Sequence, residues 1–163
     1  MAKPTKAEGA KKLKSAAQVL KGLCDDCCKD CPPGQCAQEA QAIVDAIVAA
    51  WNDHFGKGSN TSKDEIGGYL CWDWARFFRD AVKKTKPKCW KFDWQMAVGP
   101  HDKKSDFIPW HYWLALWACQ KKDKCKVMID DGWFDDDFVH TPPWPGKDWP
   151  LGNKTLPPET PKK

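Results

Sequence analysis

Hydrophobic and polar positions follow two different periods along the chain, and the period changes near the middle. Between residues 37 and 55 the apolar side chains recur at steps of three and four, which predicts an amphipathic helix. The same spacing from Cys71 to about Lys84 predicts a second helix. The first apolar stripe consists of Ala40, Ile43, Val44, Ile47, Val48, Trp51 and Phe55, and the second of Cys71, Trp74, Ala75, Phe78 and Val82.

The second half of the chain has the period of β-strands. Apolar and polar residues alternate over 89–98, which predicts a half-buried strand, whereas 111–118 is apolar on both faces, as in a central strand. Residues 126–130 are expected to return antiparallel through the polar loop between Cys119 and Cys125. Helices followed by strands predict an α+β fold, with N-terminal helices packed on an antiparallel sheet.

Three regions differ in composition. Residues 1–36 form a lysine-rich lead-in and a cysteine-rich segment, and 37–140 carry the periodic patterns of a folded core. Residues 141–163 are proline-rich and polar, so we expect a tail that lies over the surface or is disordered at its end. The total of 163 residues is enough for one domain with a substantial hydrophobic core.

Five of the nine cysteines crowd into the stretch from Cys24 to Cys36. Two interpretations remain open for them. One is a metal site built from paired C-x-x-C units, although Cys27 and Cys28 are adjacent and no zinc-ribbon loop separates the units. The other, which we favour, is a set of disulfides, and these require an oxidising compartment.

Counting the cysteines leaves one without a partner. Cys119 and Cys125 flank the expected hairpin loop, where they could pair with each other. If Cys89 joins the five N-terminal cysteines in three further bridges, the free thiol is Cys71.

Charge and composition narrow the partners and the location. The net charge is +4 and comes partly from lysine-rich ends, while the 11 tryptophans lie mostly in apolar patterns, so we expect no nucleic-acid partner. No apolar run approaches the roughly 20 residues that cross a membrane, so no membrane partner is expected. Neither is a signal peptide visible. The cysteine content favours a secreted or periplasmic protein, with a cytoplasmic location as the alternative.

Candidate chemistry begins at Cys71, the first residue of the second helix. A helix N-terminus favours a thiolate, so we expect a lowered pKa for this thiol, and Gly67-Gly68 before it permit a tight entry that leaves backbone donors for an oxyanion. A thiol nucleophile needs a base, and His111 at the start of the central strand is the candidate. The non-catalytic alternative is that Cys71 is a buried core residue and His111 a structural histidine.

An acidic residue is needed to orient the imidazole, and the returning strand ends in Asp130-Asp131. If the hairpin loop is symmetric about Lys122, Asp131 shares the face of His111 and Asp130 points away. We therefore expect Asp131 to orient His111, with Asp130 in reserve because a register slip of one residue would exchange the two.

These residues resemble the papain-like cysteine peptidase and transglutaminase-like group. Cys71-Trp72 opens a helix, His111 leads an apolar strand and Asp131-Gly132-Trp133 follows, as in that group, and the likeness covers about residues 60–138. It implies a papain-like core and a Cys71–His111–Asp131 triad that acts on an amide or related acyl bond. It further implies no cofactor, a protein or peptide-like substrate, and a monomer.

Two departures from the family pattern stand out. Only 40 residues separate Cys71 from His111, against roughly 130–150 in papain and the cathepsins, so the chain would be a compact member of bacterial type. Glu65 occupies the place, six residues before the cysteine, where papain-like enzymes have an oxyanion-hole glutamine. A carboxylate there opposes an oxyanion unless it is protonated or turned away.

Two other functions compete with hydrolysis or acyl transfer. One is a catalytically silent domain that binds a glycan or peptide in a groove lined by tryptophans. The other is a secreted effector toxin with the same thiol chemistry, whose partner would be an immunity or inhibitor protein. The tryptophans of the proposed groove are Trp110, Trp133, Trp144 and Trp149.

Overall fold

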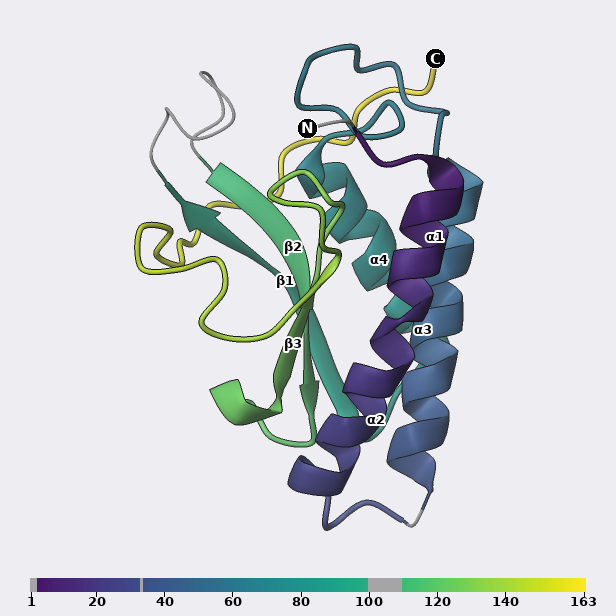
Figure 1. Cartoon of the computed structure of the whole chain (residues 1–163), viewed down its shortest axis with the longest axis vertical. Coiled ribbons are helices and arrows are strands. Elements are labelled where there is room, and N and C mark those ends of the chain that lie inside the picture. The colour runs from purple at the N-terminus through teal and green to yellow at the C-terminus, as the bar shows by residue number, and fades with distance from the viewer. Residues whose placement is uncertain (1–2, 33, 100–109) are drawn as a thin grey trace.

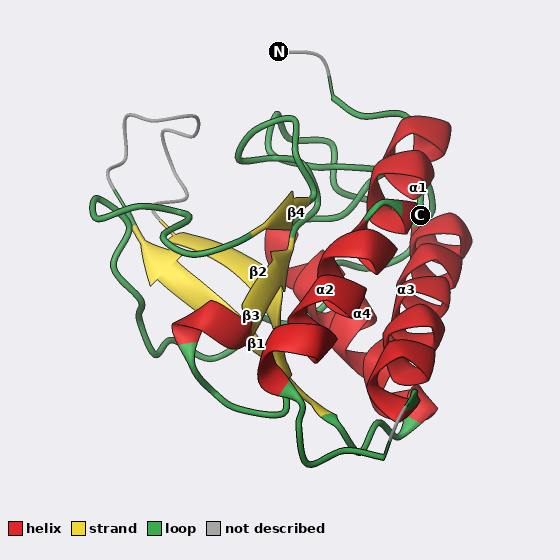
Figure 2. Cartoon of the chain, turned by 60° about the horizontal axis from the view of Figure 1, so that its bottom comes forward, coloured by secondary structure: helices red, strands yellow, loops and turns green. Residues whose placement is uncertain are grey.

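The fold is α+β, with helices gathered on one face of an antiparallel sheet (Figure 1, Figure 2). It comes from a computed structural model that describes residues 3–32, 34–99 and 110–163. Within these residues the helices are α1 (Lys6–Lys14), α2 (Ala16–Cys27), α3 (Gln35–His54) and α4 (Cys71–Thr85). The strands are β1 (Trp90–Val98), β2 (Trp110–Ala118), β3 (Lys126–Ile129) and β4 (Val139–His140), and the short 3-10 helix η1 (Asp123–Cys125) precedes β3.

The sheet has the simple order β1-β2-β3-β4, with every neighbouring pair antiparallel. β2 is central and buried along nearly its whole length, which confirms the interpretation of 111–118 as a covered strand. β1 alternates between exposed positions and buried or half-buried ones over its first half, as its period-two pattern predicts.

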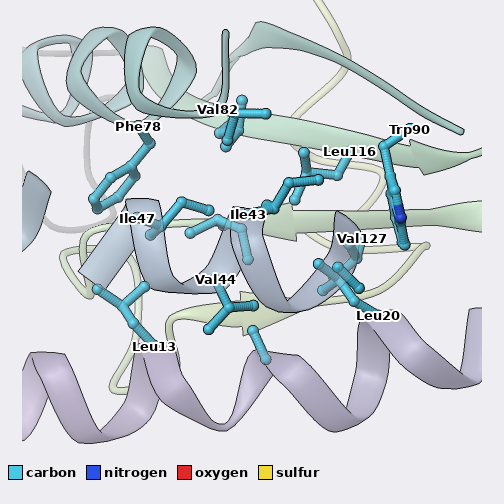
Figure 3. Packing of buried hydrophobic residues seen from close by; sticks show 14 of the residues in the cluster. Leu13, Leu20, Ile43, Val44, Ile47, Phe78, Val82, Trp90, Leu116 and Val127 are labelled. Atoms are coloured by element: carbon cyan, nitrogen blue, oxygen red, sulfur yellow. The ribbon is translucent and has the colours of Figure 1, made fainter. Parts of the chain in front are cut away.

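The core joins the helices to the sheet. Both predicted stripes are buried, apart from Phe55, which is partly buried. Side chains from α1 to α4 interdigitate with those from the three longer strands, and this packing fixes α4 across the sheet (Figure 3). The labelled residues of this cluster are Leu13, Leu20, Ile43, Val44, Ile47, Phe78, Val82, Trp90, Leu116 and Val127.

The N-terminal region contains more regular structure than the sequence analysis anticipated. The lysine-rich lead-in forms α1 and α2, which pack along α3 (Figure 1). Thr5 caps α1 by accepting a hydrogen bond from the Glu8 backbone N–H. The buried side chains of Leu13 and Leu20 hold the two helices to the core, although their lysine-rich surroundings mask the apolar stripe.

Three of the four disulfides tie this region to the sheet and the fourth joins α2 to α3, and all nine cysteines lie in the described residues. The expected bridge between Cys119 and Cys125 is wrong, because each of them pairs with an N-terminal cysteine instead. The number of bridges and the free Cys71 agree with the sequence analysis. The pairs are Cys24–Cys36, Cys27–Cys125, Cys28–Cys119 and Cys31–Cys89.

The proline-rich tail is fixed to the core as an extended segment, and we call its residues 151–163 the C-terminal strap. The strap first follows β1, where the Gly152 N–H donates to the Met96 carbonyl. It then crosses to α4, where Thr160 binds the carboxylate of Asp73. It ends beside the loop before α4, through an isolated bridge between Gly58 and Lys162 (Figure 1).

Candidate active site

Cys71 is the first residue of α4, and the chain reaches it through a turn that requires glycine. Gly67 and Gly68 have positive φ angles of 59° and 87°, and a Cβ atom on Gly68 would lie 2.3 Å from the Gly58 carbonyl oxygen. The Asp73 carboxylate then accepts the Leu70 backbone N–H at 2.8 Å and caps the helix. The N–H groups of Asp73 and Trp74 bond to the Leu70 carbonyl, which leaves those of Cys71 and Trp72 outside the bonds of this turn.

Glu65 has a structural task in this entry loop. Its carboxylate accepts the Gly68 backbone N–H and forms an ion pair with the Lys3 ammonium at 2.7 Å. The residue six positions before Cys71 therefore stabilises the turn that leads into α4. The backbone N–H groups of Cys71 and Trp72 are the hydrogen-bond donors that the helix start leaves available.

His111 lies in β2 and is completely buried beside the start of α4. Its Nε2 atom is 2.7 Å from Oδ1 of Asp130, and neither side chain is exposed. The imidazole also interacts with the Cys71 thiol. This interaction contributes to the raised pKa of His111 and opposes, without overcoming, the burial that raises the pKa of Cys71. Nδ1 forms no hydrogen bond of standard geometry within the described residues, so it is the nitrogen left for the thiol.

The aspartate against His111 is Asp130, and the preference for Asp131 rested on the wrong hairpin register. Leu114 pairs with Ile129, one residue away from the pairing that a loop symmetric about Lys122 gives. The 3-10 turn η1 takes up residues of this loop asymmetrically. In the observed register Asp130 falls on the face of His111, which is the outcome of a slip by one residue.

His111 and Asp130 form a buried ion pair. Burial alone lowers the pKa of His111, but the charge and the hydrogen bond of Asp130 raise it well above its ordinary value. Burial likewise raises the pKa of Asp130, and the charge and hydrogen bond of His111 outweigh this, so that the pKa of Asp130 is lowered. Asp130 is therefore the charged partner that orients the ring and stabilises its imidazolium form.

The thiol itself is protonated in this closed arrangement. Burial raises the pKa of Cys71, and the opposing effects of His111 and of the Tyr112 backbone N–H do not overcome it. The expectation of a lowered pKa is thus not met, because it left out desolvation. Cys71 is only 7% exposed.

Aromatic side chains line the space beside the thiol, and the C-terminal strap packs against the same hydrophobic cluster. A cavity of about 10 Å³, room for one water molecule, is lined by Asp64, Leu70, Cys71, Trp110 and Trp133. The strap adds Leu156, which packs against the hydrophobic cluster that contains Cys71. Lys154 places its ammonium 4.7 Å from the centre of the Trp110 ring.

A second, larger cavity shares Trp133 with the small one. Its volume is about 310 Å³, and its walls combine three aromatic rings with one lysine and one aspartate. Two of the four expected groove tryptophans, Trp133 and Trp149, line it, while Trp110 lines the small cavity and Trp144 stacks on His140. The lining residues are Trp133, Phe134, Pro145, Gly146, Lys147, Asp148 and Trp149.

Among the residues that the structure describes, two groups of side chains have the composition of a metal site, and neither fits an ion. In the first, His111, Asp130 and Asp131 bring ligand atoms within 4.8 Å, but the 2.7 Å contact between His111 and Asp130 is a direct hydrogen bond with no room for an ion. The second group is Cys28, Cys31 and Cys119, whose sulfur atoms belong to disulfides.

Some contributors to the site were not found in the sequence. Asp73 lies in the first turn of α4, where an acidic residue is favoured, but the cap residue is Leu70, which has no side-chain acceptor, and nothing in the tail marks Thr160 as the partner of Asp73. Asp64 accepts the Trp133 indole N–H at 3.1 Å and joins the loop before α4 to the loop after β3.

The described residues contain no helix long and apolar enough to cross a membrane. A comparison with protein-family models finds no match, and neither the curated proteins nor the solved structures include one that is significantly similar to this chain.

Proposed function

We propose that this protein is a thiol enzyme of papain-like or transglutaminase-like type, which transfers an acyl group from an amide or related bond. Cys71 is the nucleophile, His111 the general acid and base, and Asp130 the residue that orients the imidazole. The proposal corrects the earlier assignment of Asp131 to that last role.

One observation carries the proposal. The only cysteine outside a disulfide lies at the start of a helix and interacts with a buried histidine, which in turn is held by a buried aspartate. A free cysteine in the core is ordinarily a small hydrophobic residue. Here three elements, α4, β2 and the end of β3, converge to surround the thiol with an acid–base pair, which a packing role does not require.

The chemistry follows from these positions. The imidazolium of His111 carries a proton at Nδ1 and stabilises the Cys71 thiolate. The thiol proton passes to the water that enters the opened site, and the Cys71 sulfur then attacks the carbonyl carbon of the substrate. The backbone N–H groups of Cys71 and Trp72 bind the oxyanion. His111 then gives the proton to the leaving amine, a thioester forms, and water or a second amine releases the acyl group.

Catalysis requires the closed site to open. Desolvation is the largest effect that raises the pKa of Cys71; the charge of Asp131 adds to it, and His111 and the Tyr112 N–H oppose both. Movement of Trp133 or the strap would admit water and substrate, and it would thereby remove the desolvation and favour the thiolate. The same movement would therefore give the substrate access to Cys71 and make the thiol more reactive.

The substrate in this proposal is a protein or peptide-like chain. The aromatic cavity lies against Trp133, the same ring that covers Cys71, so it is placed to receive a side chain next to the reacting bond. Four disulfides are consistent with an oxidising extracellular or periplasmic location, and we propose that the protein is secreted.

A second candidate function is binding without catalysis. It is favoured by the aromatic cavity, which is far larger than the space above Cys71 and has a lysine and an aspartate among its lining residues. Tryptophan rings with a few polar groups suit a sugar or an aromatic peptide side chain.

Acyl transfer from p-nitrophenyl acetate distinguishes the two functions. We expect the parent protein to gain the mass of one acetyl group on Cys71, and the His111→Ala variant to react slower by on the order of 100-fold. The Cys71→Ser variant is the control for other sites. Equal slow rates in the parent and in the His111→Ala variant would leave the binding function as the better account.

A further inference from the structure

Two buried carboxyl groups follow one another directly after β3. Asp130 and Asp131 are each 1% exposed. Oδ1 of Asp130 faces His111, and Oδ1 of Asp131 accepts the Trp133 backbone N–H at 3.0 Å. The second oxygen of each, Oδ2, is fully buried and has no hydrogen-bond partner in the described part of the chain. The Oδ2 atoms of these two neighbouring residues are thus both buried acceptors without a donor.

A single proton resolves this arrangement. Carboxylates only accept hydrogen bonds, so two ionised groups can neither bond to each other nor lie close without repulsion. The ligand atoms of His111, Asp130 and Asp131 all lie within 4.8 Å of one another. A proton on one Oδ2 would supply a donor for the other carboxyl group, and both buried oxygens would then be satisfied.

We infer that Asp131 is a protonated carboxylic acid that donates a hydrogen bond to Asp130 and so acts as a positioning residue for His111. The proton itself is independent of any activity, whereas its effect on Cys71 rests on the proposed function. The resulting chain runs from the Asp131 acid to the Asp130 carboxylate, the His111 ring and the thiol.

The contacts decide which group carries the proton. Asp130 faces the imidazolium of His111, which stabilises its charged form, while Asp131 has only a backbone N–H. Burial and the charge of Asp130 raise the pKa of Asp131 to about 8. Other titratable groups are farther along the cluster: His140 of β4 lies 4.0 Å from Oδ2 of Asp130 and 3.5 Å from Asp135.

This assignment gives Asp131 a different role from that of an acid that faces the histidine. As a neutral donor it fixes the second oxygen of Asp130, so that the first stays directed at His111. Asparagine reproduces this role, since its NH₂ group donates and its carbonyl can accept the Trp133 N–H. Alanine removes both bonds.

Infrared spectroscopy and alkylation test the two parts separately. With ¹³C-labelled aspartate in the Cys71→Ser protein, we expect a protonated-carboxyl C=O band near neutral pH that disappears as the pH rises through about 8 and is missing in the Asp131→Asn variant. This measurement does not depend on a reactive thiol. Because the titration is carried out on protein that retains Asp131, it remains informative even if the Asp131→Asn variant does not fold. No such band, or a band that persists in Asp131→Asn, would overturn the assignment.

The positioning role is measured by the alkylation rate of Cys71. We expect Asp131→Asn to match the parent near neutral pH but to lose its dependence on pH near 8. Asp131→Ala should slow the reaction by about tenfold, the effect of one lost buried hydrogen bond. If the band is present and Asp131→Ala reacts like the parent, the positioning role is wrong. If His111→Ala also reacts like the parent, the proposed function fails while the proton assignment stands.

Discussion

Removal of the Thr160 hydroxyl tests whether the C-terminal strap controls the thiol. Thr160 is buried and donates twice to the fully buried Asp73 carboxylate, from its backbone N–H at 2.9 Å and from its hydroxyl at 2.6 Å. Thr160→Ala keeps the first bond and deletes the second. A hydrogen bond to a charged group contributes about 1.5–3 kcal/mol, so the strap should detach more readily by that free energy.

This free energy converts to a rate if Cys71 reacts only when the strap is released. Leu156 of the strap packs on the cluster around Cys71, and the space above the thiol holds only one water molecule. Labelling then follows the population of the open form. Since about 1.4 kcal/mol is a factor of ten, Thr160→Ala should accelerate alkylation roughly 10- to 100-fold.

The assay is alkylation by iodoacetamide without reductant, followed by intact mass, which counts labels on the single free cysteine. Thr160→Ser retains the hydroxyl and should label at the parent rate. Thr155→Ala is the matched control within the strap, because Thr155 contributes its carbonyl to the Tyr112 hydroxyl and not its side chain. A urea titration separates release of the strap from global unfolding. A Thr160→Ala rate equal to that of the parent would refute the idea that the strap gates Cys71.

Three further predictions concern the site and the bridges. Asp130→Asn should lower the pKa of His111 in an NMR titration, because it removes the charge that raises this pKa. It should also slow Cys71 alkylation more than Asp131→Asn does. A larger effect of Asp131→Asn would instead support Asp131 as the residue that orients His111. Non-reduced protein should weigh about eight hydrogens less than the reduced chain, as four disulfides require, whereas full-mass protein with bound zinc would contradict the bridges. The raised pKa of Asp131 favours the protonated folded state, so its contribution to stability is complete below about pH 4 and is lost at about 1.4 kcal/mol per pH unit up to about 8. Urea unfolding of Asp131→Asn should lack this loss; parallel curves would contradict it.

Local periodicity was sufficient for the elements that bury one clear stripe. The helices α3 and α4 and the strands β1 and β2 were predicted close to their observed bounds, because their apolar positions repeat without interruption. The helices α1 and α2 were not predicted, because the many lysines in this segment interrupt its apolar pattern and its cysteines indicated a compact disulfide-bonded segment instead. Leu13, Leu20 and Cys24 nevertheless recur at helical spacing and are buried.

Nonlocal features were beyond the sequence pattern. The choice between Asp130 and Asp131 depended on one residue of register in a loop whose 3-10 turn leaves no hydrophobic signal. Disulfide connectivity depends on which segments meet in space, so the pairing of Cys119 with Cys28 could not be read from spacing. The pKa of Cys71 was misjudged for a related reason, since Trp110 and Trp133, which line the space beside the thiol, are distant from it in the sequence.

The position of the bridges allows a reactive thiol and four disulfides to coexist in one small protein. A thiolate attacks disulfides on contact and would scramble them through mixed intermediates. Cys119 follows the end of β2, however, while His111 and its thiol partner lie near the beginning. Seven residue steps separate His111 from Ala118, about 23 Å at the rise of a strand. In the folded chain the free thiol is thus separated by about the length of a strand from the disulfides that it would otherwise exchange with, so the proposed reactivity of Cys71 does not endanger the bridges.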